Sequence, residues 1–216
     1  MSKWIDYTIE ERKTMVQTVS ELKQIDEASV EKDWWVTAVL YAVFHTSIGS
    51  FLSFKGGTSL SKGWRVINRF SEDIDLALNR DFFLNTKGLS CAKCASNTQI
   101  HNLRECAQDY IFGDFKTELE TELKNLGLYV SVVGDNDLTD EKGEQRKVPH
   151  DKDPSVIFVE YPSLYNSSAS YAAPVVKIEI SVLSMVEPFE MRRISSLIEQ
   201  AFSVENVDSD FVQTIK

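Results

Sequence analysis

The chain has 216 residues, of which 43% are hydrophobic and 26% are charged, a composition typical of a globular protein with a hydrophobic core. Its net charge of −10 argues against a broad, non-specific nucleic-acid binder but still allows a local basic groove. No apolar run reaches the length of a bilayer span and the N-terminus lacks an apolar signal region, so we expect a cytoplasmic protein without membrane contact.

The first part of the chain has helical patterns. Apolar residues of segment 8–24 recur roughly on one face of a helix, and segment 27–47 is apolar enough to predict a buried helix with Ser29 as its N-cap. Trp34 and Trp35 are expected to pack in the core. We expect residues 1–50 to form an N-terminal helical segment packed on the remainder.

The remainder of the chain alternates between strand and helix patterns. Strands are predicted at 51–54, 73–78, 126–135, 155–165 and 174–184. A turn and a short helix are predicted at 56–67, further helices at 100–126 and within 191–202, and polar connectors at 91–99, 136–154 and 166–173. This order predicts an α+β fold, with a mixed β-sheet flanked by helices over residues 51–200 and the helical segment before it.

An Asp-x-Asp pair lies inside the apolar strand pattern EDIDLAL. Because side chains alternate between the two faces of a strand, Asp73 and Asp75 share one face, and Ile74, Leu76 and Leu78 share the other. Two carboxylates on one face lie about 6–7 Å apart at Cα, and they repel one another unless a cation lies between them. Oxygen ligands of this kind suit Mg²⁺ or Mn²⁺ rather than structural zinc.

A second apolar strand pattern, VVKIEIS, repeats this arrangement. Lys177 and Glu179 share the face opposite to its apolar residues. A carboxylate in the middle of a buried strand needs a partner. If this strand lies beside the Asp73 strand, Glu179 supplies a third carboxylate, and three carboxylates can hold two divalent ions for in-line phosphoryl displacement. Otherwise Lys177 and Glu179 are surface residues of a half-exposed strand.

A glycine turn precedes the Asp-x-Asp strand. Gly56 and Gly57 allow the backbone to approach a ligand closely. Thr58 or Ser59 is expected to cap the next helix, whose N-terminal N–H groups favour a phosphate.

Basic residues follow on that helix. Lys62, Arg65 or Val66, and Arg69 lie near one helical face, which suits a triphosphate or an RNA end. Each of these motifs alone is usually structural. Their occurrence together and in this order indicates nucleotidyl transfer, in which the protein mainly positions groups and neutralises charge.

The cysteines resemble a zinc knuckle in composition. However, six residues separate Cys94 from His101 instead of four, and Cys106 falls on the apolar face of a predicted helix. Free thiols are favoured for Cys91, Cys94 and Cys106, because an odd number of cysteines also argues against a disulfide framework.

Four segments together resemble the AbiEii-type nucleotidyltransferase toxin family, a branch of the DNA-polymerase-β-like nucleotidyltransferase fold. They are VEKDWWVTAVLYAVF, FKGGTSLSKGW, RFSEDIDLAL, and VVKIEIS followed by VEPFEMRRISSLI. The resemblance covers most of residues 28–80 and 155–200, and the order and spacing of the motifs agree as well as their letters.

The resemblance implies a role for each candidate site residue. Gly56, Gly57 and Thr58 would face the triphosphate of an NTP. Ser71 begins a segment that matches the family's Ser-x-Asp-x-Asp, and it would support the site or the phosphates. Lys177 would be a phosphate contact.

The resemblance also implies the metal ligands. Asp73 and Asp75 would bind Mg²⁺ (or Mn²⁺), and Glu179 would be the third acidic position of this catalytic, metal-binding set.

The implied function is transfer of a nucleotide from an NTP to an RNA acceptor, such as the 3′ end of tRNA. The enzyme would be a toxin of a type IV toxin–antitoxin or phage-defence system, with a cognate antitoxin as partner. The family continues with a helical C-terminal half that carries a further Lys and an Arg/Asp-rich motif. We therefore expect residues 201–216 to begin a missing or truncated region. The alternative is a non-catalytic nucleotide- or partner-binding remnant of the fold.

Overall fold

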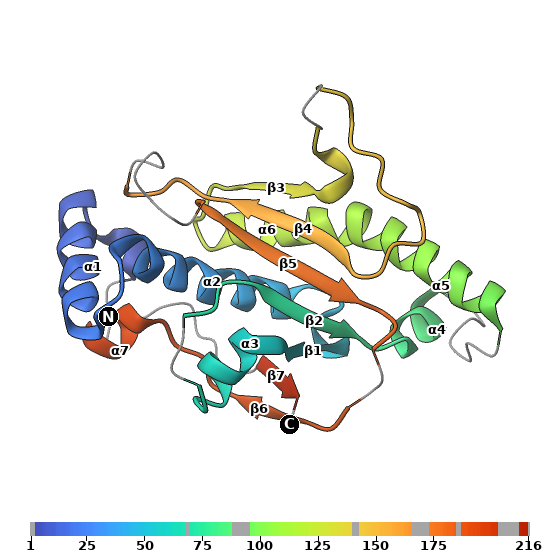
Figure 1. Ribbon diagram of the computed structural model, residues 1–216, viewed down its shortest axis with the longest axis horizontal. Helices are drawn as coiled ribbons and strands as arrows, with labels where there is room; N and C mark the ends of the chain where they lie inside the picture. Colours follow the sequence, from blue (N-terminus) through green and yellow to red (C-terminus); the bar gives the residue numbers. More distant parts are fainter. Residues whose placement is uncertain are drawn as a thin grey trace.

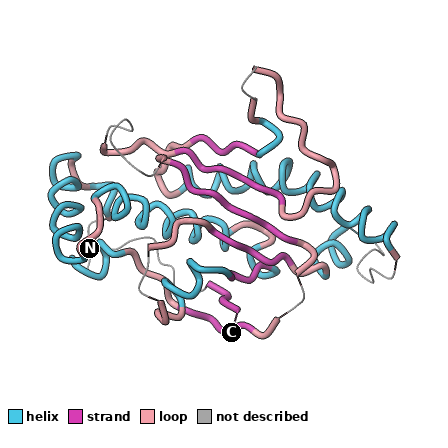
Figure 2. The backbone as a smooth tube through the Cα atoms, in the orientation of Figure 1, coloured by secondary structure: helices cyan, strands magenta, loops and turns pink. Residues whose placement is uncertain are grey.

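The computed structural model describes residues 3–67, 70–87, 96–139, 143–165, 173–184, 187–202 and 212–215. Its helices are α1 Ile9–Lys23, α2 Glu27–His45, α3 Gly56–Thr58, α4 Asp81–Lys87, α5 Asn97–Tyr110, α6 Lys116–Asn125 and α7 Leu197–Phe202. Its strands are β1 Leu52–Lys55, β2 Ile74–Leu78, β3 Ser131–Gly134, β4 Ser155–Glu160, β5 Val175–Ser181, β6 Phe189–Arg192 and β7 Val212–Ile215 (Figures 1 and 2).

The strands of the described residues form one mixed sheet in the order β3-β4-β5-β2-β1-β7-β6. The pairs β2–β5 and β1–β7 are parallel, and the other neighbours are antiparallel. Helices α2 and α6 pack against this sheet, while α1 and α7 pack against α2 (Figure 1). The predicted α+β class is confirmed.

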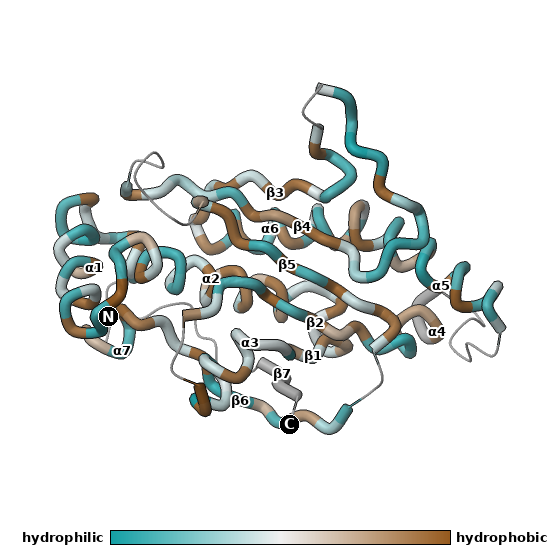
Figure 3. Tube along the Cα trace, in the orientation of Figure 1, coloured by the Kyte–Doolittle hydropathy of each residue, from teal (hydrophilic) through white to brown (hydrophobic). Residues whose placement is uncertain are grey.

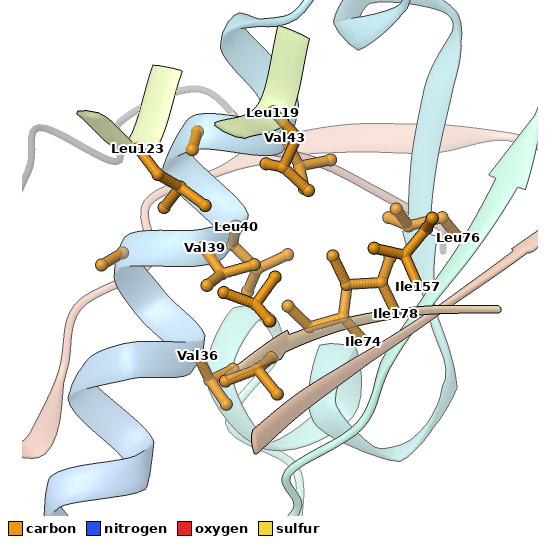
Figure 4. Close-up of a cluster of buried hydrophobic side chains, with 14 of the residues drawn as sticks. Val36, Val39, Leu40, Val43, Ile74, Leu76, Leu119, Leu123, Ile157 and Ile178 are labelled. Carbon is orange, nitrogen blue, oxygen red and sulfur yellow. The ribbon is translucent and has the colours of Figure 1, made fainter. Parts of the chain in front are cut away.

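Helix α2 forms the centre of the hydrophobic core. Its residues Val36, Val39, Leu40 and Val43 are fully buried and face the apolar side of β2 and β5 (Figure 4). Complete burial of an aliphatic side chain of this size contributes about 1.5–3 kcal/mol. Because α2 covers the apolar side of the sheet, the polar side chains of β2 and β5 face away from it.

The start of α2 differs from the prediction. Asp26, not Ser29, is the N-cap, and its carboxylate accepts hydrogen bonds from the backbone N–H of Ser29 at 2.9 Å and from the Ser29 hydroxyl at 2.6 Å. Ser29 therefore lies inside the first turn of α2, and the Asp26 carboxylate accepts the hydrogen bond from its free backbone N–H. Trp34 and Trp35 are buried, as predicted, and Trp35 stacks on Tyr161 with ring centroids 4.8 Å apart.

The other predicted elements are present at the expected positions, but some of their boundaries differ. The long helix predicted at 100–126 begins earlier, at Asn97, and a π-helical turn, Ile111–Phe115, divides it into α5 and α6. The predicted strand at 126–135 shortens to β3. Part of the predicted helix at 191–202 is instead the end of β6, and α7 begins only at Leu197.

Two strands and one helix lie outside the predicted set. Helix α4 follows β2, and strands β6 and β7 pair with each other and extend the sheet beyond β1. Among the residues that the structure describes, none of the helices combines the length and the apolarity needed to cross a membrane.

Candidate functional site

The parallel pairing of β2 with β5 brings two of the predicted carboxylates together. Asp75 lies directly opposite Glu179 in the β2–β5 register. Asp73 is exposed and lies one residue before β2 begins. Polar and apolar residues alternate along β5 (Figure 3), so Glu179 lies on the side of the sheet away from α2. We refer to Asp73, Asp75 and Glu179 as the carboxylate face.

Two lysines flank the carboxylate face. Lys55, the last residue of β1, pairs with Asp75 in the antiparallel β1–β2 register, and its Nζ donates a hydrogen bond to Ser184 Oγ at 2.7 Å. Lys177 forms an ion pair with Glu179 on the same strand, with side chains that are 37% and 29% exposed. The face therefore combines three acids with two cations.

Asp75 has a raised pKa because of its surroundings. Burial raises the pKa of its carboxyl, and the charges of Glu179 and Asp73 raise it further, while Lys55 and Lys177 act in the opposite direction. The pKa of Lys177 is also raised, first by its hydrogen bond to Glu179 and then by the surrounding carboxylates. Negative charge thus exceeds what the two lysines neutralise around Asp75.

Gly56 makes the close packing of the glycine turn on Asp75 possible. Its φ of +74° lies in the left-handed region, and a Cβ at this position would overlap Asp75 Oδ2. The turn also begins the helix sooner than predicted, because α3 starts at Gly56 with the extended Lys55 as its N-cap. Thr58 and Ser59, the predicted caps, therefore lie inside the helix and its π-helical continuation η3, Ser59–Gly63.

The hydroxyl of Thr58 supports the segment that carries Asp73. It is 0% exposed, lies 2.7 Å from Ser71 Oγ and donates to the backbone carbonyl of Asp73 at 2.5 Å. In this structure the Thr58 side chain holds the Ser71–Asp73 segment instead of presenting its hydroxyl to solvent. Gly57 is half-buried in α3 beside it.

The oxygen donors of the carboxylate face have the chemistry that a hard divalent cation requires. Over the described part of the chain, no group of three or more His, Cys, Asp or Glu side chains is gathered closely enough to hold a metal ion. The Glu179 carboxylate is paired with Lys177 in this structure. The excess negative charge at Asp75 fits a cation there.

A buried ionic network, not predicted from the sequence, connects α2 to the site. Lys62 Nζ contacts Asp33 Oδ1 at 2.5 Å, with side chains only 7% and 8% exposed, and it donates to Thr37 Oγ1 at 3.0 Å. The other Asp33 oxygen accepts from the backbone N–H of Leu197 at 2.7 Å. Lys62, predicted on a face for a triphosphate or RNA, is therefore engaged inside the protein.

A second ion pair of α2 holds the segment before β2. Lys32 Nζ lies 2.5 Å from Oε2 of Glu72, the residue between Ser71 and Asp73 in the sequence. Charged residues within the apolar pattern of α2 were the available signal for these contacts, because a buried charge needs a partner. Arg69, predicted on the same basic face as Lys62, lies outside the described residues.

Replacing Lys62 with Met is expected to lower the free energy of unfolding by about 3 kcal/mol, because it leaves the buried Asp33 carboxylate without its cation. Urea denaturation followed by circular dichroism measures this loss. Lys124→Met, at an exposed position of α6, is the control and should change stability little. Equal stability of the two variants would show that the Lys62–Asp33 pair contributes nothing.

The zinc alternative has no support among the described residues. Cys91 and Cys94 lie outside them. Cys106 lies partly buried on α5, and His101 lies 3.4 Å from the carboxylates of Glu105 and Asp151. Neither residue belongs to a metal-binding group within the described ranges.

Comparisons with known proteins give a family match and a structural alignment. The sequence model of a family described as "Nucleotidyl transferase AbiEii toxin, Type IV TA system" matches residues 38–210, which include every predicted site residue. No curated protein matches the chain. The structure of MenT4, nucleotidyltransferase toxin Rv2826c from Mycobacterium tuberculosis H37Rv, aligns with a TM-score of 0.47 and 16% identity, over 93% of this chain and 54% of that chain. The chain thus spans about half the length of that toxin.

Proposed function

We propose that this chain, which belongs to the AbiEii family of nucleotidyltransferase toxins of type IV toxin–antitoxin systems, is a metal-dependent enzyme that transfers a nucleotide from an NTP to RNA. The proposed acceptor is an RNA 3′ end such as that of tRNA, and a cognate antitoxin is the proposed partner. The observation that carries the proposal is the pairing of Asp75 with Glu179 on adjacent parallel strands, directly beside the glycine turn.

The reaction assigned to this site is an in-line displacement. The terminal hydroxyl oxygen of the RNA attacks the α-phosphorus of the NTP, and a new phosphodiester bond forms. The bond between that phosphorus and the oxygen bridging to the β-phosphate breaks, and pyrophosphate leaves with its electron pair. The hydroxyl proton passes to a carboxylate of the carboxylate face or to water.

The residues of the site have distinct proposed roles. Asp73, Asp75 and Glu179 would hold Mg²⁺ or Mn²⁺, which supplies neutralisation of phosphate charge when bound. Lys177, with 37% of its side chain exposed, can exchange its contact with Glu179 for a phosphate oxygen. Lys55 balances the charge of Asp75 from the other side.

The remaining residues position these groups. Gly56 and Gly57 bring the backbone of the glycine turn close to Asp75, so that a triphosphate held at the carboxylate face would also lie near this turn. Thr58 holds the backbone of Asp73 in place by donating to its carbonyl, and the Ser71 hydroxyl contacts that of Thr58.

Incubation of the purified chain with each α-³²P-labelled NTP and tRNA transcripts tests the proposal. We expect label on RNA only with a divalent cation, complete loss of labelling in excess EDTA, and recovery when Mg²⁺ or Mn²⁺ is added beyond the chelator. Gel electrophoresis measures the label, and a coupled assay measures the pyrophosphate released.

Other outcomes identify which part of the proposal fails. Undiminished labelling in EDTA would contradict metal dependence. Calorimetric binding of an NTP without pyrophosphate release would instead support a non-catalytic nucleotide-binding domain. Labelled protein in place of labelled RNA would contradict the acceptor.

A further inference from the structure

A cavity of about 460 Å³ lies where η3, the segment before β2 and helix α7 meet. Ser71 lines this cavity, and its hydroxyl lies 2.7 Å from that of Thr58, which in turn bonds the backbone of Asp73. The cavity is therefore linked to the carboxylate face through Ser71, Thr58 and the backbone of Asp73. Its volume falls within the range of small-ligand sites, about 300–1,000 Å³.

The lining of the cavity combines apolar side chains with hydroxyls. Ile67, Phe70 and Leu197 supply an apolar wall that a planar base could pack against. Ser61 and Ser71 supply hydroxyls. This combination suits a nucleoside, which has an apolar ring face and polar edges.

The cavity also has its own cations. Lys23 and Arg65 line it, and both residues are exposed. Within the described ranges, neither of them forms an ion pair with a carboxylate. Among the described lining residues Asp33 is the one with a carboxylate, and both of its oxygens are already engaged, by Lys62 and by the Leu197 N–H.

We propose that this cavity receives the 3′-terminal nucleotide of the RNA acceptor, with the base on the apolar wall and a backbone phosphate near Lys23 and Arg65. The inference rests on the proposed function. An NTP would have its phosphates at the carboxylate face and the glycine turn, so it offers no further charge to these two cations. An RNA end has a phosphodiester on the 5′ side of its last nucleoside and matches them.

The charge of the whole chain strengthens this assignment. A protein with a net charge of −10 repels RNA at long range, so a local cationic site must provide the attraction. The contacts from Ser71 through Thr58 to Asp73 connect the cavity to the carboxylate face, where the terminal hydroxyl of a bound nucleotide is needed.

RNA affinity of the double variant Lys23→Gln/Arg65→Gln tests the inference, with a short fluorescent single-stranded RNA that ends in a free 3′ hydroxyl. We expect the Kd for this RNA to rise about tenfold, and the slope of log K against log salt to fall by about 1.4, the loss of two phosphate contacts on a single strand. The Kd for Mg²⁺–NTP, measured by calorimetry, should stay within about twofold.

The control is Lys13→Gln/Lys124→Gln, which removes the same charge at exposed positions of α1 and α6. A control that loses as much RNA affinity as the cavity variant would overturn the inference, as would a cavity variant that binds RNA like the parent. An equal loss of NTP affinity would assign the cavity to the NTP and also overturn it.

A crosslinking measurement on the unaltered chain keeps the inference testable if the double variant fails to fold. RNA with 4-thiouridine as its 3′-terminal nucleotide should crosslink to peptides containing Phe70 or Leu197, and the same label at the 5′ end should not. Neither binding nor crosslinking requires turnover. If transfer is absent but these results hold, the proposed function alone fails; if transfer occurs without them, the cavity assignment alone fails.

Discussion

Asp75→Asn is expected to abolish nucleotide transfer while making the metal-free protein more stable. The substitution removes a charged oxygen donor from the centre of the carboxylate face without changing the size of the side chain. Loss of a ligand of the cation that would neutralise developing phosphate charge should lower kcat/KM by about a thousandfold, or ~4 kcal/mol. Incorporation of labelled nucleotide into RNA measures this directly.

The stability effect follows from the raised pKa of Asp75. A carboxyl whose pKa is higher in the folded than in the unfolded state is less favourably ionised when folded, so it reduces stability above the folded pKa. It has no such effect below the unfolded pKa, where both states are protonated. Asn, which is neutral throughout, should raise the thermal midpoint near neutral pH, and the difference should vanish in acid.

A divalent cation should reverse the order of the two thermal midpoints, so that the parent chain becomes more stable than the Asp75→Asn variant. Mg²⁺ that binds the folded parent chain stabilises it by mass action, whereas the variant gains less. Thermal unfolding with EDTA and with Mg²⁺ separates the two effects. Glu120→Gln, at an exposed position of α6, is the matched control and should leave transfer and stability unchanged. An Asp75→Asn protein that transfers nucleotide at the parent rate would remove Asp75 from the site.

Gly56→Ala is expected to lower transfer by about a hundredfold, because displacement of a catalytic group by about 1 Å costs that much. A Cβ at Gly56 would overlap Asp75 Oδ2 and lie 2.8 Å from its Cγ, so the Asp75 carboxylate must move. The φ of +74° adds strain for any other residue, and we expect stability to fall by about 1–3 kcal/mol. Steady-state kinetics and urea denaturation measure the two losses.

Gly113→Ala is the matched control for this substitution. A Cβ at Gly113 meets no atom within 4 Å, and this glycine lies in the π-helical turn between α5 and α6. Alanine there should preserve transfer and should not destabilise the fold. If Gly56→Ala keeps the parent activity, the close approach of the glycine turn to Asp75 has no catalytic importance.

Local sequence patterns predicted the faces of the site strands well. The alternation in EDIDLAL and VVKIEIS placed Asp75 and Glu179 on one face of their strands and the buried Ile74 and Ile178 on the other face. The structure agrees. This succeeds because side chains in a strand alternate whatever the neighbouring strands are. The apolar character of segment 27–47 predicted a buried helix for the same reason, since the pattern belongs to the element itself.

Positions set by contacts between distant segments were not predictable in this way. The partner of Lys62 is Asp33 of α2, and the residue opposite Asp75 on its other side is Lys55 of β1. Both depend on how elements pack and on strand register, which no local pattern specifies. Strands β6 and β7 were not predicted for the same reason. Each is only four residues long, and the two are paired with each other although they lie apart in the sequence.

The sequence by itself determined which side chains each strand and helix presents together, including the acids of the candidate site. Only the tertiary structure decided that β2 and β5 are neighbours, that Gly56 packs against Asp75, and that the cavity lies beside Ser71. The physical reason is that periodicity is a property of one segment, whereas pairing, close approach and cavities arise from packing between segments far apart in the chain.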